Sequence, residues 1–208
     1  MHATIVPQAS HTTLQHVGGY ATMRDMPEEH AATASLELIS RSVVETVALG
    51  RRLGAWLQPG DVVLLYAPLG AGKTHLTKGI AAAWGVDEAE VSSPTFVLVN
   101  VYEADRAHGR RPIYHVDLYR IDAPEQLVAL GWDDVLAGDG LTIIEWAERA
   151  EGWLPREHLA IHIAHLGPEQ RQLRFCAQGA RPRQVLEALR ADLLRDAARA
   201  EQQDAAGD

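Results

Sequence analysis

The stretch from residue 61 to residue 84, DVVLLYAPLGAGKTHLTKGIAAAW, constrains this chain more than any other part of the sequence. Its first part, Val62–Tyr66, is a short apolar run rich in β-branched residues, which predicts a strand buried on both faces. A turn of Pro, Gly and Ala follows. From Lys73 onward apolar residues recur at helical spacing, and Gly85 stands where the helix is expected to end. Strand, glycine loop and helix in this order predict a phosphate-binding site.

The residue types in this loop suit a polyphosphate. Gly70 and Gly72 let the backbone curl and bring its N–H groups close to the anion. Lys73 is expected to contact the β- and γ-phosphates, and the hydroxyl of Thr74 to ligate Mg²⁺. The pattern G-x-x-x-x-G-K-[ST] is met except at its first position, where Ala67 stands. The alternative is an ordinary strand, turn and helix with an exposed lysine. The predicted nucleotide-binding residues of the loop are Leu69, Gly70, Ala71, Gly72, Lys73 and Thr74.

Composition narrows the class of protein. A length of 208 residues with 47% hydrophobic content suits one α/β domain with short appendages. The net charge of −9 and the absence of a basic stripe disfavour direct, tight binding of tRNA or DNA. The single cysteine, Cys176, excludes an internal disulfide and is expected to be a buried thiol. No apolar stretch is long enough to span a membrane and no leader pattern opens the chain, so a cytoplasmic location is expected.

The chain divides into three predicted parts: a flexible extension over 1–35, a P-loop domain over 36–180, and a C-terminal helix with a tail over 181–208. A helix is expected over 42–57, because Ser42 and Glu45 have the spacing of a capping box. This helix could bring Thr46 or its neighbours to the adenine, or only cover the sheet. The apolar side of the C-terminal helix is expected to pack on the core, with docking on a partner as the alternative. That side contains Val185, Leu186, Leu189, Leu193 and Leu194.

Two hairpins are expected beside the P-loop strand. Residues 96–103 and 112–121 predict one antiparallel pair, and 158–164 with 172–177 predict another. The overall expectation is a P-loop NTPase-like sheet flanked by helices, with these antiparallel hairpins added. Arg171, between the last two strands, could reach an adenine or a phosphate, although a solvated turn residue is the expected reading.

Two acids lie at predicted strand ends, where ligands of α/β sheets gather. Asp117 follows the apolar part of 112–121, and Glu145 ends the buried run LTIIEW. Mg²⁺ requires hard oxygen ligands, so either carboxylate could serve, or either could merely face solvent. Ser93 and Thr95 flank a proline in a loop placed like a nucleotide switch, where Thr95 could sense the γ-phosphate; a plain turn is the alternative.

Four motifs together are more specific than the phosphate loop alone. In order and spacing, the segments LGAGKT, SSPTF, HVDLYR and IIEWAE, at 69–74, 92–96, 115–120 and 143–148, closely resemble the TsaE family. Members of this family are the ATPase component of the bacterial machinery that makes threonylcarbamoyladenosine in tRNA. The resemblance covers roughly residues 38–177.

The resemblance implies roles for individual residues. It implies that the loop glycines with Lys73 and Thr74 bind ATP and Mg²⁺, and that residues 93–95, including Thr95, form a switch-like loop. Asp117 matches an acid implicated in hydrolysis, Glu145 one assigned to Mg²⁺, and Trp146 lies beside the site.

The resemblance also implies partners. A TsaE-like chain binds the paired proteins TsaB and TsaD and hydrolyses ATP, plausibly resetting the pair between turnovers. TsaD, not the TsaE-like chain, joins the threonylcarbamoyl group to the adenosine, so tRNA is engaged only indirectly. The family loop usually starts Gly-Asp-Leu-Gly, whereas this chain has Ala67 and Pro68, and Pro68 removes a backbone donor.

Two other functions fit the same loop. One is a small-molecule kinase with Arg106, Arg110 and Arg111 as a lid over the phosphates. The other is a non-catalytic, nucleotide-dependent adaptor, which Ala67 and Pro68 make more credible. A GTPase is disfavoured because the sequence contains no N-K-x-D segment to read the base.

Overall fold

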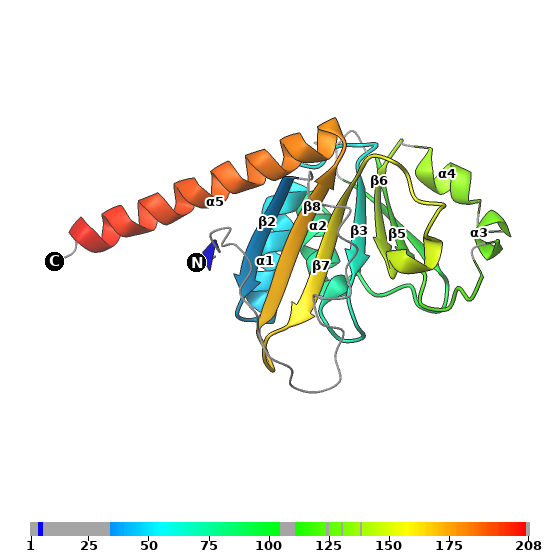
Figure 1. The fold of residues 1–208 in the computed structure, drawn as a ribbon, viewed down its shortest axis with the longest axis horizontal. Coiled ribbons are helices and arrows are strands. Elements are labelled where there is room, and N and C mark those ends of the chain that lie inside the picture. Colours follow the sequence, from blue (N-terminus) through cyan, green and yellow to red (C-terminus); the bar gives the residue numbers. More distant parts are fainter. Residues whose placement is uncertain are drawn as a thin grey trace.

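The computed structural model describes residues 4–5, 34–104, 111–123, 125–129, 131–137 and 139–206. Within them, eight strands form one sheet in the order β1-β2-β8-β7-β3-β6-β5-β4, with helices on both faces (Figure 1). The strands are β1 (Thr4–Ile5), β2 (Ala34–Ser40), β3 (Val62–Tyr66), β4 (Val99–Glu103), β5 (Pro112–Asp117), β6 (Leu141–Glu145), β7 (His158–His165) and β8 (Arg171–Gln178). The helices are α1 (Val43–Gly54), α2 (Lys73–Ala83), α3 (Gln126–Ala129), α4 (Trp132–Leu136) and α5 (Ala180–Ala206), with a 3₁₀ turn over Ala147–Ala150.

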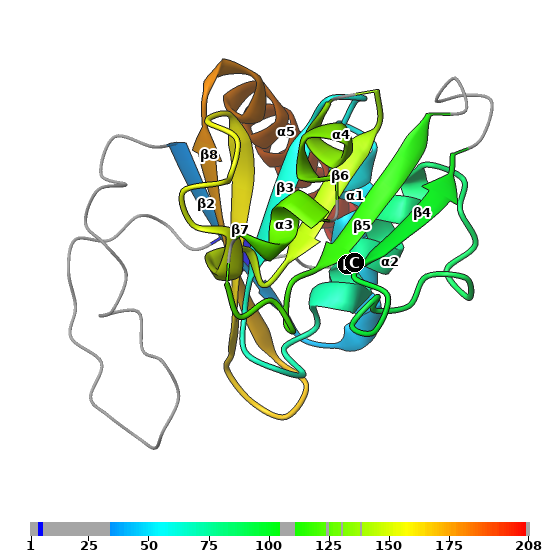
Figure 2. The same cartoon turned by 90° about the vertical axis from the view of Figure 1, so that its right-hand side faces the viewer.

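The middle of the sheet is parallel and its edges are antiparallel. Strand β3 pairs in parallel with β6 and β7, and β6 pairs in parallel with β5. Strand β8 runs antiparallel to both β7 and β2, and β4 runs antiparallel to β5 at the other edge (Figure 2). The predicted α/β class and both predicted hairpins are therefore confirmed.

The first hairpin is shorter than its sequence pattern suggested. Strand β4 begins at Val99 instead of residue 96, because Val97 and Leu98 both turn back to donate to the carbonyl of Pro94. Leu98 has a positive φ of 67°, and Phe96 is 83% exposed. Strand β5 ends at Asp117 instead of continuing to Ile121, because the Tyr119 amide bonds to the Asp117 side chain. Both apolar runs thus include turn residues beside the sheet.

Alternation along β3 divides the interior into two cores. Val63 and Leu65 face a core shared with α1, α2 and α5, whereas Val62 and Leu64 face a core shared with α3 and α4. All four side chains are buried, which explains why the strand reads as a continuous apolar run. The loop that follows β3 is thereby held at the carboxyl end of a strand that is buried on both faces.

Helix α1 begins as its capping pattern predicts. The amide of Glu45 donates to the hydroxyl of Ser42 at 3.1 Å. The carboxylate of Glu45 returns to the amide of Arg41 at 2.7 Å, one residue before the position that a capping box uses. The helix ends at Gly54 instead of Leu57, where the chain tightens through a Trp56 amide bond to Leu53.

Helices α1 and α2 cross where glycines replace side chains. A Cβ atom on Gly79 would overlap the carbonyl oxygen of Val47 and lie 2.9 Å from the amide of Arg51. Gly50 and Gly54 face α2 from the other side at similarly close range. The indole of Trp84 donates to the carbonyl of Gly54 at 3.2 Å. The crossing brings α2, and with it the loop at its N-terminus, to a fixed position.

Replacing Gly79 with alanine is expected to destabilise the fold by about 3 kcal/mol, because the added methyl meets backbone atoms that cannot move independently. Urea unfolding followed by circular dichroism measures this loss. The control is Gly167→Ala, because a Cβ atom at this position would lie 3.9 Å from Gln170, which is an ordinary contact. This variant is expected to change stability by less than about 0.5 kcal/mol. Equal stability of the two variants would contradict this account of the helix crossing.

Helix α5 packs its first half on the sheet, as its apolar side predicts. Val185, Leu186, Leu189 and Leu193 are buried in the core, whereas Leu194 is 52% exposed and lies off the packed side. Figure 1 shows the C-terminal half of this helix extending beyond the sheet.

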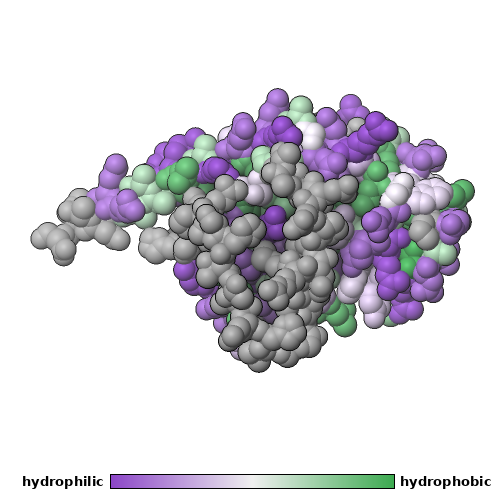
Figure 3. All heavy atoms as spheres, viewed as in Figure 1, coloured by the Kyte–Doolittle hydropathy of each residue, from purple (hydrophilic) through white to green (hydrophobic). Residues whose placement is uncertain are grey.

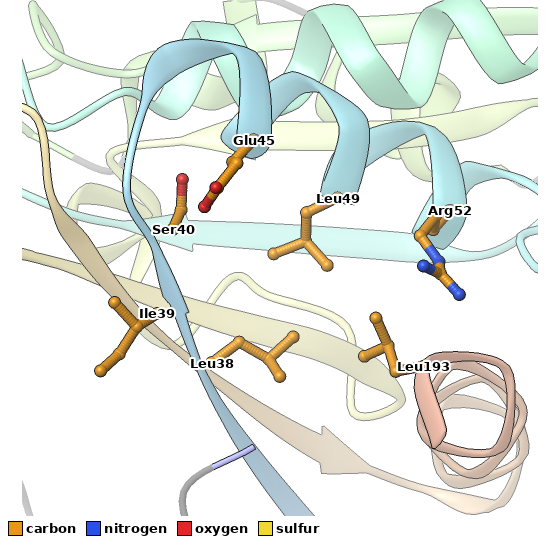
Figure 4. Close-up of a pocket in the computed structure, with 7 residues that line it drawn as sticks. All are labelled: Leu38, Ile39, Ser40, Glu45, Leu49, Arg52 and Leu193. Atoms are coloured by element: carbon orange, nitrogen blue, oxygen red, sulfur yellow. The ribbon is translucent and has the colours of Figure 1, made fainter. Parts of the chain in front are cut away.

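Polar contacts fix the same helix at two points. Arg181 bonds to the carboxylate of Asp61 at 3.0 Å and 3.1 Å, and Arg52 bonds to Asp192 at 2.8 Å. A small cavity of about 20 Å³ remains between β2, α1 and α5, lined in part by Leu38, Leu49 and Leu193 (Figure 4). This space is about the size of one water molecule, so it marks imperfect packing of α5 and does not suit a substrate.

The three-part division of the chain remains a prediction. Residues 1–3 and 6–33 lie outside the described residues, Thr4–Ile5 pairs with β2, and Ala34 and Ser35 already belong to β2.

Cys176 is buried, as expected, and burial raises the pKa of its thiol. Among the described helices, none combines the length and apolarity needed to cross a membrane. The face in Figure 3 is mainly hydrophilic where its residues are described.

Candidate nucleotide site

A cavity of about 320 Å³ lies at the carboxyl ends of β3, β5 and β6. This is the edge where ligands of parallel sheets bind. It brings together residues from all four sequence motifs. The lining residues are Leu69, Gly70, Gly72, Lys73, Thr74, His75, Ser93, Thr95, Asp117, Tyr119, Glu145 and Trp146.

The loop between β3 and α2 has the backbone that its glycines predict. Gly70 and Gly72 adopt φ values of 74° and 104°, which residues with a Cβ atom rarely adopt. Gly72 caps α2 without a side-chain hydrogen bond, so the first amides of the helix point into the loop. This arrangement of glycine conformation and helix N-terminus suits an anion.

The ammonium of Lys73 is held at the loop by three groups. Its Nζ donates to the carbonyls of Ala67 at 2.8 Å and Pro68 at 3.2 Å, and lies 3.9 Å from the ring centroid of Trp146. Burial lowers the pKa of Lys73, while the nearby carboxylates of Glu145, Glu148 and Asp117 act in the opposite direction. Since the accepting groups are backbone carbonyls, this contact does not depend on which residue types stand at positions 67 and 68.

Glu145 and Thr74 form the contact that joins the loop to β6. The Thr74 hydroxyl donates to Oε1 of Glu145 at 2.9 Å, and Glu145 is only 2% exposed. The same oxygen lies 2.9 Å from Nε2 of His115 on β5. A buried carboxylate is thus satisfied by two side chains that come from different elements.

The Thr74 and Glu145 oxygens fit a magnesium site. Neighbouring ligands in an octahedral shell with bonds of 2.0–2.1 Å lie about 2.9 Å apart, which is the observed Oγ1 to Oε1 separation of 2.9 Å. No group of three or more His, Cys, Asp or Glu side chains in the described residues could hold a metal by itself. Mg²⁺ typically takes one or two carboxylates and completes its shell with water and phosphate oxygens.

Asp117 has a different set of partners. Its Oδ2 accepts hydrogen bonds from the hydroxyls of Ser93 at 2.5 Å and Thr95 at 2.7 Å, and its Oδ1 accepts from the Tyr119 amide. Asp117 is therefore the anchor of the loop over residues 92–95. The sequence could not distinguish the roles of the two acids, but their contacts differ. Glu145 bonds to Thr74, whereas Asp117 bonds to the hydroxyls of Ser93 and Thr95 in the loop over residues 92–95, the hydroxyl loop.

Trp146 closes the side of the cavity through an unusual backbone conformation. Its φ of 59° and ψ of 44° are left-handed, which costs a non-glycine residue about 1–3 kcal/mol. The turn ends β6 and places the indole between Lys73 and Tyr119, whose ring centroid is 5.0 Å away. Next to it, burial raises the pKa of Glu148, while Lys73 acts to lower it.

Two predicted residues lie outside the cavity lining. Thr46 is buried, and its hydroxyl bonds to Ser40 at 2.8 Å and to the Ser42 carbonyl at 3.2 Å, so the structure does not bring it to the site. Ala71 is also buried, and its carbonyl accepts a hydrogen bond from Arg171 of the β7–β8 hairpin.

Arg171 is not a solvated turn residue, so that expectation was wrong. Its Nε donates to the carbonyl of Ala71 at 3.0 Å, and its Nη1 donates to the carbonyls of Gly167, Pro168 and Gln170. One guanidinium thus ties the phosphate loop to the tip of the β7–β8 hairpin.

His115 was missed as a candidate by reasoning from the sequence. The available signal was its position two residues before Asp117, because alternate residues of a strand share a face.

Comparisons with known proteins point to one family. The family model "Threonylcarbamoyl adenosine biosynthesis protein TsaE" matches residues 40–173. The tRNA threonylcarbamoyladenosine biosynthesis protein TsaE of Bacillus subtilis is 39% identical over 145 residues, covering 70% of this chain and 87% of the relative. The protein of the same name from Treponema pallidum is 37% identical over 138 residues, covering 66% and 98%.

The crystal structure of YdiB from Bacillus subtilis matches the fold with a TM-score of 0.64 at 32% identity. The match covers 77% of this chain and 97% of that one. All four motifs that contribute residues to the cavity lie within the matched residues 40–173. The chain therefore belongs to the TsaE family of tRNA threonylcarbamoyladenosine biosynthesis proteins.

Proposed function

We propose that this chain is a Mg²⁺-dependent ATPase that works with TsaB and TsaD in the synthesis of threonylcarbamoyladenosine in tRNA. The observation that carries the proposal is the convergence, in one cavity, of a glycine phosphate loop, the Thr74–Glu145 oxygen pair and the hydroxyl loop anchored on Asp117. Family membership supports the pathway, and the geometry supports the reaction type.

The residues would divide the work of hydrolysis between them. The loop amides and Lys73 would bind the β- and γ-phosphates, for which Lys73 exchanges its carbonyl partners for phosphate oxygens. Thr74 and Glu145 would hold Mg²⁺, which neutralises charge on the phosphate oxygens when bound. Thr95, fixed by Asp117, lines the same cavity and would orient the attacking water with that acid.

The partners are proposed to be proteins, with tRNA engaged only indirectly. A net charge of −9 opposes contact with a phosphate backbone and is compatible with docking on a protein. Ser93 and Thr95 of the 92–95 loop line the cavity, so hydrolysis there would rearrange this loop and thereby reset the TsaB and TsaD pair.

Turnover of ATP with and without purified TsaB and TsaD tests the proposal. We expect slow release of phosphate to water by the chain alone, stimulation of about tenfold or more by the pair, and loss of activity when EDTA removes Mg²⁺. Equal rates with and without the pair would contradict the partner role. Phosphate found on an added metabolite would indicate a kinase, and ATP binding without turnover in the presence of both partners would indicate an adaptor.

A further inference from the structure

His115 lies beneath the proposed metal site and has no role in the account above. The imidazole belongs to β5, is fully buried, and has Nε2 at 2.9 Å from Oε1 of Glu145. Its other nitrogen, Nδ1, is buried and has no hydrogen-bond partner among the residues that the structure describes. The ring of Tyr102 on β4 packs against it with centroids 6.2 Å apart.

These contacts determine which nitrogen carries the proton. The carboxylate of Glu145 can only accept, so the contact at 2.9 Å requires a proton on Nε2. Nδ1 is then an acceptor without a partner, which a protein interior tolerates better than a buried N–H without one. The geometry therefore places a proton on Nε2 of His115, and this N–H points at one oxygen of Glu145.

Of the two donors on that oxygen, His115 is the one that lies outside the proposed coordination shell. The other is the Thr74 hydroxyl, whose oxygen is itself a proposed ligand of Mg²⁺. Hydrogen bonds from outside the coordination shell orient ligating carboxylates, and their loss typically reduces metal affinity by about 10- to 100-fold.

We infer that His115 is a positioning residue for the magnesium site, where its Nε2–H fixes the rotation of the Glu145 carboxylate toward Thr74. The inference rests on the proposed function and adds to it. His115 acts through Glu145 and does not touch the nucleotide. The imidazole also packs against the ring of Tyr102, whose hydroxyl contacts the backbone of Ser92 at the start of the hydroxyl loop.

Calorimetric titration with ADP, in magnesium and in EDTA, tests the inference with the full chain. In His115→Leu, which removes the donor at similar volume, the gain in affinity from magnesium is expected to fall by about 10- to 100-fold. Affinity in EDTA is expected to stay within about twofold, since loop and lysine contacts are unchanged. His115→Gln, which can place an amide N–H near the same oxygen, is expected to retain the gain within about threefold.

The control is Tyr114→Phe, which removes a hydrogen bond to Asp139 from the neighbouring residue of β5 and should leave both affinities unchanged. A leucine variant that keeps the magnesium gain would overturn the inference. So would equal losses with and without magnesium, which indicate only a structural role. Nitrogen-15 NMR of labelled imidazoles must show the Nε2–H form, and an Nδ1–H form would refute the geometry. If magnesium has no effect on the native chain, the proposed function fails together with the inference.

Discussion

Replacing Lys73 with alanine is expected to lower kcat/KM for ATP by about 10³-fold, or about 4 kcal/mol. The ammonium is held at the glycine loop by two carbonyls and the Trp146 ring, which places it for the proposed contact with the γ-phosphate. No other Lys or Arg side chain lines the cavity among the described residues, so none there replaces the missing charge. Steady-state phosphate release with TsaB and TsaD present measures the loss.

The matched control is Lys78→Ala on the same helix, because Lys78 does not line the cavity. Its turnover is expected to stay within about twofold of the native value. Thermal unfolding should show that both variants remain folded. If Lys73→Ala were to hydrolyse ATP at the native rate, the loop would not be the site of phosphate binding.

Replacing Asp117 with asparagine is expected to reduce kcat by about 10²- to 10³-fold, while the affinity for ATP changes by less than about threefold. The carboxylate accepts from Ser93 and Thr95 through Oδ2 and from the Tyr119 amide through Oδ1, whereas an asparagine amide has only one accepting oxygen. The hydroxyl loop then loses its charged anchor, whereas the phosphate loop keeps its contacts. Single-turnover hydrolysis and equilibrium binding of ADP separate the two quantities.

The same substitution at Asp139 is the control, because that residue is exposed and its carboxylate accepts a hydrogen bond from the Tyr114 hydroxyl at 3.2 Å. Asp139→Asn should hydrolyse ATP normally. A parallel fall in affinity and turnover in Asp117→Asn would place Asp117 in nucleotide binding, and the assignment of the two acids would have to be exchanged.

The elements near the site could be predicted because their signals are local. The apolar run of β3, the glycines at 70 and 72, and the Ser42 cap each act on backbone within a few residues. Predictions were weaker where an apolar run continued into a turn. The chain leaves β5 after Asp117 because that side chain binds the backbone two residues later, and hydropathy does not report such a contact.

The contacts of the site depended on the strand order. Thr74 and Glu145 are 71 residues apart and meet because β6 lies directly beside β3. Arg171 reaches the phosphate loop across 100 residues because the β7–β8 hairpin folds beside it. The overlap that excludes a side chain at Gly79 likewise arises only when α1 crosses α2. No spacing along the chain encodes these distances.

The sequence by itself determined the phosphate loop, the α/β class, the two hairpins and the resemblance to the TsaE family, because each is set by residue type and short-range spacing. The tertiary structure decided which acid meets Thr74, which acid holds the hydroxyl loop, and that His115 contacts Glu145 and Arg171 contacts Ala71. The physical reason is that hydrogen bonds act over about 3 Å, and only the packing of the sheet and helices brings distant parts of the chain that close.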